Sequence, residues 1–328
     1  MSDRIALVST SYPEEAGDPS GHFVAAEAAT LARAGHRVLV VTTLGTTSRS
    51  RIADNGIEVL RLPAGESAGW PGVMPRLRQR PLRALSLLRW IERARRALRQ
   101  RAPFDRTIAH FLFPAGFPLV ASLPSNGVVE VVVHGSDARL CARLPRPLRR
   151  GVGAALQRRN AHFRCSSHDV ARTLELALGL PAGSSSIATP LLDLDGVPDR
   201  ARCRQLLGLD PARRVAVVVG RLVPGKRVDE ALAATRLIEG LETIVVGDGP
   251  ELERLERDFP EATFVGRVPR PRALAWIAAA DVLVSASRDE GAPSVIREAR
   301  ALGVAVVARP AGDVARWAET DRGLIVVP

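Results

Sequence analysis

The stretch Val-Ala-Val-Val-Val-Gly-Arg-Leu-Val-Pro-Gly-Lys-Arg, residues 215–227, joins an apolar run to a loop that carries a glycine and several cations. Its Lys226 is the only lysine of the chain, among 46 basic residues. Arg221 offers a planar fork of donors and Lys226 a compact charge on a flexible stem, a combination that suits a diphosphate. We therefore predict an anion site where the strand 215–219 ends. The alternative is that one lysine survived by chance.

Short apolar runs alternate with helical patterns along the whole chain. In the first half they predict strands at 5–10, 36–42, 57–62, 107–111, 128–133, 162–166 and 187–189, with a helix at 21–34. In the second half they predict strands at 215–219, 243–246, 263–265, 282–285 and 304–308, with helices at 228–238 and 293–302. This alternation indicates parallel strands joined by right-handed crossovers. The predicted fold class is α/β, with two Rossmann-like, doubly wound parallel-sheet domains facing across a cleft.

A length of 328 residues favours two domains, each with its own core. We predict an N-terminal domain over 1–190, a hinge over 191–199 and a C-terminal domain over 200–328. The hinge region, from Pro190 to Asp199, is rich in proline and aspartate. Asp193 and Asp195 form an Asp-x-Asp pair there, but they lie in a linker rather than at a strand end, so we predict no metal site.

Three further loops follow predicted strands of the second half, where ligands of doubly wound folds gather. Gly-Asp-Gly-Pro at 247–250, which includes Gly249, and Val-Gly-Arg-Val at 265–268, which ends at Val268, are weak signals because simple turns look the same. The strongest is Glu-Gly-Ala-Pro-Ser-Val-Ile-Arg-Glu at 290–298. There the amides of Ser294 and Val295 begin a helix that favours an anion, and Glu290 and Glu298 can accept bonds from sugar hydroxyls.

Charge is concentrated in one segment. The chain has a net charge of +11, and residues 76–106 hold eleven arginines against Glu92 and Asp105, a net +9. Leu85, Leu88 and Ile91 recur there at helical spacing, which predicts a basic amphipathic helix. Such a helix can rest on an anionic membrane surface or be a solvated face. Nucleic acid is not an expected partner, because aromatic residues make up only 4% of the chain and offer few stacking platforms among these arginines.

The start Met-Ser-Asp-Arg has no signal-peptide pattern, and no apolar stretch approaches the roughly 18 residues that span a bilayer. We expect a cytoplasmic protein, with a peripheral position at the inner face of the membrane left open. Cys141, Cys165 and Cys203 are widely spaced without a Cys-x-x-Cys pair, which predicts reduced, packed thiols.

Taken in order, Gly-Arg-Leu to Lys226, Gly-Asp-Gly-Pro, and Glu-Gly-Ala-Pro to Glu298 resemble the retaining family 4 glycosyltransferases of the GT-B fold. The resemblance covers nearly the whole chain. Gly21 in Pro-Ser-Gly-His-Phe-Val, the segment from His110 to Gly116, and His-Gly-Ser-Asp at 134–137 are similar to segments of the family's first domain. Members usually continue past the strand matching 324–327, whereas this sequence ends at Pro328, so we expect a shortened C-terminus.

The resemblance implies roles for single residues. Arg221 and Lys226 would hold the diphosphate of a nucleotide sugar, Glu298 its ribose and Glu290 the transferred sugar, while Gly21 would bring amides near the phosphates and His134 would lie by the reaction centre. The expected catalytic residues are His134, Arg221, Lys226 and Glu290. The expected donor-binding residues are Gly21, Gly220, Arg221, Lys226, Gly249, Val268, Glu290, Gly291, Ser294, Val295 and Glu298.

The function that follows is a retaining, metal-independent transfer of a hexosyl-type group from a nucleoside diphosphate sugar to a lipid-linked, polysaccharide or small-molecule acceptor. No cofactor is expected besides this donor substrate, whose base and sugar are open. Alternatives are a nucleotide-sugar epimerase on the same architecture, a non-catalytic membrane-surface protein with a vestigial cleft, and a nucleic-acid binder.

Overall fold

The chain folds into two compact α/β units. The computed structural model describes residues 2–15, 17–44, 51–53, 56–67, 73–124, 127–288 and 290–328. The units divide between Leu191 and Leu192, one residue after the predicted end of the first domain. Leu194 and Val197 pack against the core of the second unit, so the segment predicted as a hinge belongs largely to that unit.

In the described part of the first unit, eight strands form one sheet in the order β3-β4-β2-β1-β5-β6-β7-β8. Their bounds are β1 Arg4–Val8, β2 Arg37–Leu44, β3 Arg51–Ala53, β4 Ile57–Pro63, β5 Arg106–His110, β6 Val128–Val133, β7 His162–Cys165 and β8 Ser186–Ile187. All pairings are parallel except that of β3, an edge strand that the sequence did not predict and that pairs antiparallel with β4. The strand order reverses between β1 and β5, which makes the carboxyl ends of these two strands the switch point.

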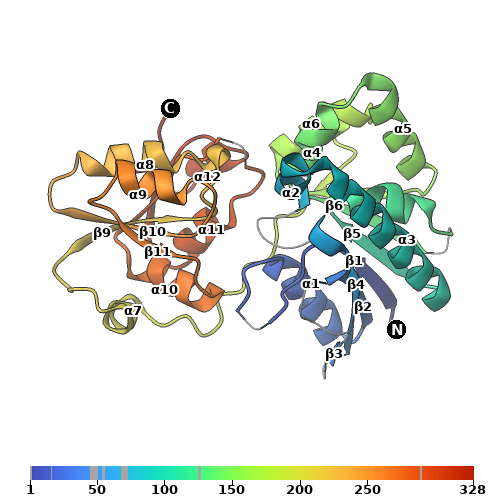
Figure 1. The fold of residues 1–328 in the computed structure, drawn as a ribbon, viewed down its shortest axis with the longest axis horizontal. Helices are drawn as coiled ribbons and strands as arrows, with labels where there is room; N and C mark the ends of the chain where they lie inside the picture. Colours follow the sequence, from blue (N-terminus) through green and yellow to red (C-terminus); the bar gives the residue numbers. More distant parts are fainter. Residues whose placement is uncertain are drawn as a thin grey trace. The chain divides into compact units, whose positions relative to one another are not determined.

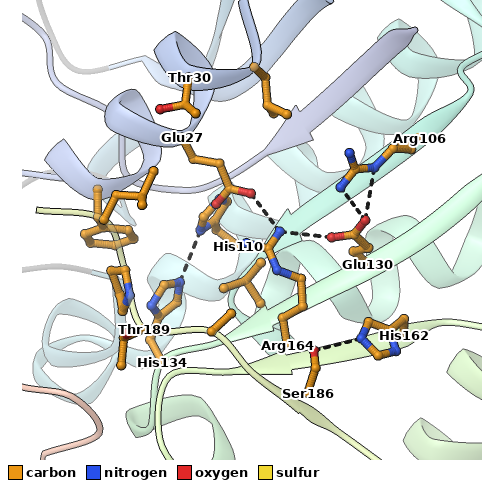
Figure 2. A pocket seen from close by; sticks show the side chains of 16 residues that line it. Glu27, Thr30, Arg106, His110, Glu130, His134, His162, Arg164, Ser186 and Thr189 are labelled. Atoms are coloured by element: carbon orange, nitrogen blue, oxygen red, sulfur yellow. Dashed lines mark hydrogen bonds and ion pairs between the residues drawn. The ribbon is translucent and has the colours of Figure 1, made fainter. Parts of the chain in front are cut away.

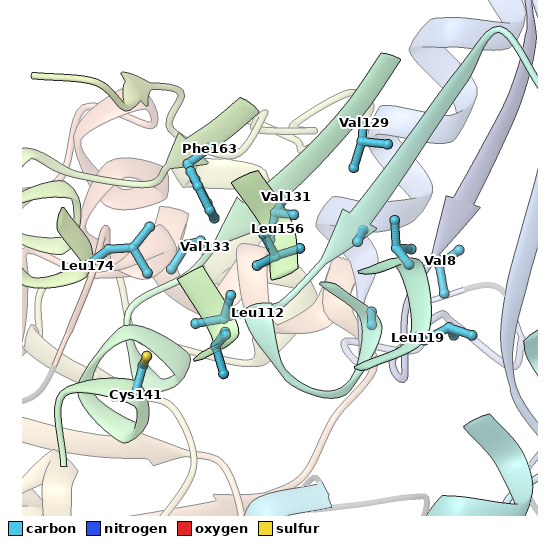
Figure 3. Close-up of a cluster of buried hydrophobic side chains, with 14 of the residues drawn as sticks. Val8, Leu112, Leu119, Val129, Val131, Val133, Cys141, Leu156, Phe163 and Leu174 are labelled. Atoms are coloured by element: carbon cyan, nitrogen blue, oxygen red, sulfur yellow. The ribbon is translucent and has the colours of Figure 1, made fainter. Parts of the chain in front are cut away.

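Helices cover this sheet, and one face of it holds the larger core of the unit. The helices are α1 His22–Arg33, α2 Val73–Gln79, α3 Ala84–Arg101, α4 Ser136–Ala142, α5 Arg146–Gln157 and α6 His168–Leu178 (Figure 1). Figure 3 shows Val131 and Val133 of β6 packed with Leu156, Phe163 and Leu174 in this core. The thiols of Cys141, Cys165 and Cys203 are buried and free, as predicted.

The second unit repeats the architecture with a smaller sheet. Over the described residues its strand order is β11-β10-β9-β12-β13-β14, and the pairings are parallel. The strands are β9 Arg214–Val219, β10 Leu241–Val246, β11 Thr263–Gly266, β12 Val282–Ser285, β13 Ala305–Ala308 and β14 Leu324–Val326. The helices are α7 Arg200–Leu207, α8 Val228–Arg236, α9 Leu252–Asp258, α10 Arg270–Ala279, α11 Ser294–Ala301 and α12 Val314–Ala318. The predicted α/β class with two Rossmann-like parallel-sheet units is confirmed.

The apolar run 215–219 fills β9 after Arg214, and it is explained by helices on both faces of the second sheet. Val215 and Val217 point into one core cluster and Val218 into another, so successive side chains are buried on opposite faces. The strand order reverses between β9 and β12. The loops after these two strands, which carry Lys226 and Glu290, therefore lie at the switch point of this unit.

Within the basic segment 76–106, residues 84–101 form the amphipathic helix α3, but the apolar residues of this helix point in two directions. Trp90, Ala94 and Leu98 of α3 are buried in the core, whereas Leu85 and Leu88 are more than half exposed. At about 100° per residue, Leu85 and Leu88 point well away from the buried stripe. Among the described helices, none is long and apolar enough to cross a membrane.

Candidate active site

The loops after β9 and β10 run against each other at the carboxyl ends of these neighbouring strands. The amide of Gly220 donates to the carbonyl of Val246, and that of Leu222 to the carbonyl of Asp248, each at 3.0 Å. Gly249 follows in the second loop. Backbone hydrogen bonds thus hold the Gly-Arg-Leu and Gly-Asp-Gly-Pro loops together in a fixed relation.

Lys226 and Glu290 meet on the two sides of the switch point, although they are 64 residues apart. The Nζ of Lys226 donates to Oε1 of Glu290, and the two side chains are only 22% and 17% exposed. Arg221 is exposed and, with Gly220 and Lys226, lines a small pocket between β9 and β12. The structure therefore brings together four of the predicted donor-binding residues: Gly220, Arg221, Lys226 and Glu290.

Ser294 and Val295 form the first turn of α11, directly after Gly291 and the N-cap residue Pro293. Proline has no side-chain acceptor, and the described structure shows no side-chain hydrogen bond at this cap. The first amides of α11 are thus placed as predicted, at a helix end that favours negative charge.

Glu298 lies in the next turn of α11 and is buried, with 4% of its surface exposed. Its Oε1 accepts from Nη1 of Arg270 at 2.7 Å, and Nη2 of the same arginine donates to the carbonyl of Asp193 at 3.2 Å. The carboxylate is therefore held by a partner of its own, and its contact with a ribose stays a prediction. Val268 lies two residues before α10 and is partly buried.

Gly21 is the N-cap residue of α1 in the first unit. Its φ of +68° lies in the left-handed region that favours glycine, and a Cβ there would lie 2.4 Å from the carbonyl oxygen of Ser11. The backbone of the loop after β1 thus packs directly on the start of α1, which leaves no room for a side chain. That Gly21 brings backbone amides near the phosphates of a donor stays a prediction.

His134 follows β6 and sits in an aromatic setting in the first unit. Its ring centroid is 4.7 Å from those of Phe23 and Phe111 and 5.4 Å from that of His110, against which it stacks at 15°. Burial, and the repulsion that a protonated His110 would exert, hold the pKa of His134 well below its usual range. The ring of His134 is therefore neutral at physiological pH, which suits orientation of a substrate rather than proton donation.

A cavity of about 550 Å³ opens beside this histidine, on the sheet face opposite the core of Figure 3. Figure 2 shows the charged side chains that line it, which come from one helix and three neighbouring strands. They form a chain of ion pairs: Glu27 to Arg164 at 2.7 Å, Arg164 to Glu130 at 2.9 Å, and Glu130 to Arg106. The charges of this cavity are thus balanced within the first unit.

Asp137 fixes the backbone around His134. Its carboxylate accepts from the amides of His134, Gly135 and Ala138 through Oδ1, and from that of Leu112 through Oδ2, at 2.8–3.1 Å. Burial raises the pKa of Asp137, although these backbone bonds oppose the rise. The motif His-Gly-Ser-Asp therefore ties the loop after β6 to the loop after β5.

Sequence reasoning missed Glu27, Glu130 and Arg164 as parts of this region. One signal was available: Glu130 interrupts the strand Val-Val-Glu-Val-Val-Val, where a charge needs a partner. Over the described residues, no group of three or more His, Cys, Asp or Glu side chains could hold a metal ion. Independence from metal stays a prediction.

Comparison with known proteins places the chain in a family. The model for glycosyl transferases group 1 matches residues 213–328, and the model for the glycosyl transferase 4-like domain matches residues 20–185. The chain belongs to this glycosyltransferase family. The matches include the loops of Lys226 and Glu290 in one unit and His134 in the other, and they confirm the resemblance to family 4.

Relatives and solved structures agree with this assignment. TuaC, a glycosyltransferase of Bacillus subtilis (strain 168), is 28% identical to this chain. The matched region covers 74% of this chain and 64% of the length of TuaC. A GDP-mannose-dependent alpha-mannosyltransferase of Mycolicibacterium smegmatis is 28% identical over 86% of this chain and 73% of its own length. Sucrose-phosphate synthase of Thermosynechococcus elongatus has a TM-score of 0.77 at 20% identity, over 99% of this chain and 86% of that one. WaaG has a TM-score of 0.68 at 18% identity, over 98% and 85% of the two chains. These structures show the GT-B fold.

Proposed function

We propose that the protein is a retaining glycosyltransferase that takes a hexosyl-type group from a nucleoside diphosphate sugar. The observation that carries the proposal is the direct contact of Lys226 with Glu290 at the switch point of the second unit. A cation for a diphosphate and a carboxylate for sugar hydroxyls lie there side by side. Arg221 and the first turn of α11 provide further donors close in the sequence to these two residues.

In the proposed reaction the bond between the anomeric carbon and the diphosphate oxygen breaks, and the acceptor oxygen bonds to the same face of that carbon. The acceptor proton passes to an oxygen of the leaving diphosphate. Arg221 and Lys226 neutralise the charge that develops on this leaving group, an effect that can contribute several kcal/mol in a site shielded from water. With two cations in this role, the reaction needs no divalent metal.

Thermal shift and transfer assays test the donor. Three relatives are GDP-mannose-dependent alpha-mannosyltransferases by name. HepE of Anabaena, whose structure has a TM-score of 0.65 to this chain at 17% identity, was solved in complex with UDP. GDP-mannose, UDP-glucose and an ADP-sugar therefore form the first panel. We expect one of them to raise the melting temperature, and NMR of the product to show the donor's anomeric configuration. Activity should persist in EDTA. An inverted product would contradict retention, and loss of activity in EDTA would contradict metal independence.

Lys226→Ala tests the site itself. We expect turnover to fall by about 100-fold or more, because loss of a group that stabilises transition-state charge costs about 3 kcal/mol. Arg257→Ala on α9 removes an arginine whose side chain is 73% exposed and is the matched control. Undiminished transfer by Lys226→Ala would remove this residue from the mechanism.

We also propose that the first unit rests on an anionic membrane surface through residues 76–106, which would bring it to a lipid-linked acceptor. Leu82, Leu85 and Leu88 are 83%, 57% and 58% exposed in this arginine-rich segment. Exposed apolar side chains among cations suit an interface with anionic lipid, to which each arginine near the surface contributes about 1 kcal/mol.

Vesicle flotation tests this surface. The protein should float with phosphatidylglycerol vesicles and not with phosphatidylcholine vesicles, and a triple change of Leu82, Leu85 and Leu88 to serine should weaken the binding. Leu176→Ser is the control, because Leu176 is 76% exposed on α6, outside this segment. Equal flotation of the triple variant and the control variant would contradict the proposed surface.

A further inference from the structure

Glu27 lies beside the histidine pair, although no motif of the sequence points to it. Its Oε1 accepts from Nη1 of Arg164 at 2.7 Å, and its Oε2 lies 3.2 Å from Nε2 of His110. Figure 2 shows the carboxylate of Glu27 between these two groups. His110 is 1% exposed, so its Nε2 is shielded from water and any hydrogen-bond partner of this nitrogen must come from the protein.

The two imidazole rings are linked through their nitrogens. Nδ1 of His110 lies 3.2 Å from Nε2 of His134, a hydrogen-bonding distance at which one nitrogen must donate and the other accept. A neutral imidazole has one donor and one acceptor nitrogen. The position of the proton on His110 therefore decides the position of the proton on His134.

Glu27 is ionised at this site and can only accept hydrogen bonds. Burial by itself would raise the pKa of Glu27, but His110 and Arg164 together lower it to about 2. Nε2 of His110 is buried and has no hydrogen bond of good geometry to a described residue, and the carboxylate of Glu27 lies within ion-pair distance of it, at 3.2 Å. A carboxylate there favours the tautomer of His110 that carries its proton on Nε2.

We propose that Glu27 is a positioning residue that holds the proton of His110 on Nε2. Nδ1 of His110 then accepts from Nε2–H of His134, and Nδ1 of His134 carries no proton. The ring of His134 is thus fixed as an acceptor at Nδ1, ready for a hydroxyl donor.

The remaining charges of the cavity keep Glu27 in place. Arg164 on β7 holds one oxygen of Glu27, and Glu130 on β6 accepts from the same arginine nitrogen at 2.9 Å. Glu130 in turn accepts from Nε of Arg106 at 3.0 Å. A carboxylate held in this way cannot rotate away from His110 without leaving the partly buried guanidinium of Arg164 with one partner fewer, which is costly.

The effect on catalysis rests on the proposed function, with the additional role of His134 in orienting the donor sugar. An acceptor nitrogen can bind a sugar hydroxyl, whereas a ring that presents N–H to that hydroxyl would compete with its proton. A change in tautomer behind a reacting group lowers turnover more than it lowers substrate affinity.

Nitrogen NMR of the histidine rings tests the proposal directly and needs no activity. The chain has six histidines, and the variants His110→Gln and His134→Gln assign the two signals of interest. At a pH near 8 we expect both rings in the Nε2–H form in the unmodified protein. In Glu27→Gln the side-chain amide can donate to His110, so both rings should gain Nδ1–H populations. A His134 that carries its proton on Nδ1 in the unmodified protein would overturn the proposal, whatever the variant does.

Enzyme kinetics provide a second test of the role of Glu27. We expect Glu27→Gln to lower kcat by about tenfold to 100-fold with the donor KM within about threefold. Glu130→Gln is the matched control, since it alters the same ion-pair chain without touching a histidine, and it should leave the tautomers unchanged. An unchanged kcat in Glu27→Gln, or equal tautomer shifts in the two variants, would overturn the proposal. Absence of transfer by the unmodified protein would count against the proposed function alone, because the NMR result stands by itself.

Discussion

Replacing Asp137 by alanine should be among the most damaging single changes in the first unit. The carboxylate accepts from four backbone amides, three of which belong to the buried residues Leu112, Gly135 and Ala138. A buried amide left without an acceptor costs about 1–3 kcal/mol, so these three alone give about 3–9 kcal/mol. Removal of a buried charge offsets part of this cost. We expect the free energy of unfolding to fall by about 3 kcal/mol.

Replacing Asp137 by asparagine tests the bond at Oδ2 of the carboxylate separately from the three bonds at Oδ1. The amide side chain would keep one oxygen, which can serve the three backbone amides that now bond to Oδ1 of Asp137, while its NH₂ group would face the amide of Leu112. Only one buried amide then loses its acceptor, so Asp137→Asn should cost about 1–3 kcal/mol. The lost bond is the one between the loops after β5 and β6, and transfer activity should fall with it.

Urea denaturation followed by circular dichroism measures the cost, and hydrogen exchange of peptides covering 111–116 and 133–139 locates it. Asp105→Ala is the control in the same unit, because it removes one exposed bond of 2.7 Å to the amide of Arg4. The reasoning is refuted if Asp137→Ala loses no more stability than Asp105→Ala, or if exchange at Leu112 and Gly135 does not increase.

Three further outcomes are expected. Lys226→Arg should lower donor kcat/KM by about tenfold, since the larger fork cannot replace a compact charge beside Glu290; equal kcat/KM would contradict this. The pKa of Glu27 is lowered from 4.5 to about 2, so its contribution of about 3 kcal/mol is present above pH 4.5 and is lost as the pH falls towards 2. Acid titration of Glu27→Gln should therefore show a flatter loss of stability over this range, and a parallel curve would count against it. Gly312→Ala should destabilise the second unit by about 2 kcal/mol or more in thermal denaturation, because φ is +58° and the new Cβ would lie 2.0 Å from the carbonyl oxygen of Gly291. Substitution of Gly303, which has open space around its Cβ position, is the control, and equal losses would refute the clash.

The strands and the loops that carry Lys226 and Glu290 could be predicted because their signals are local. An apolar run followed by glycine marks the carboxyl end of a buried strand wherever it occurs, and parallel strands align these ends. The edge strand β3 was not predicted, since its three residues are too few to show a period.

The contacts of Glu27 could not be predicted, because they depend on the order of strands in the sheet. Glu27 on α1 and Arg164 on β7 are 137 residues apart in the sequence. They meet because β7 joins the same sheet as β1, with β5 and β6 between them, so that α1 and these strands line one cavity. Hydrophobic patterns predict which segments are strands but not which strands are neighbours. The division of apolar residues on α3 was missed for a similar reason, since a helical period does not say how wide the buried stripe is.

The contact between Lys226 and Glu290 also bears on selectivity among anions. In the structure the lysine already has a carboxylate partner, so an inorganic phosphate that engaged the lysine would draw it from Glu290 and offer that carboxylate no hydroxyl in return. A nucleotide sugar can bring a negative charge for the lysine and hydroxyl groups for the glutamate at the same time. Under the proposed function, the pairing of Lys226 with Glu290 therefore disfavours binding of free phosphate relative to a nucleotide sugar. We expect inorganic phosphate to inhibit transfer only weakly.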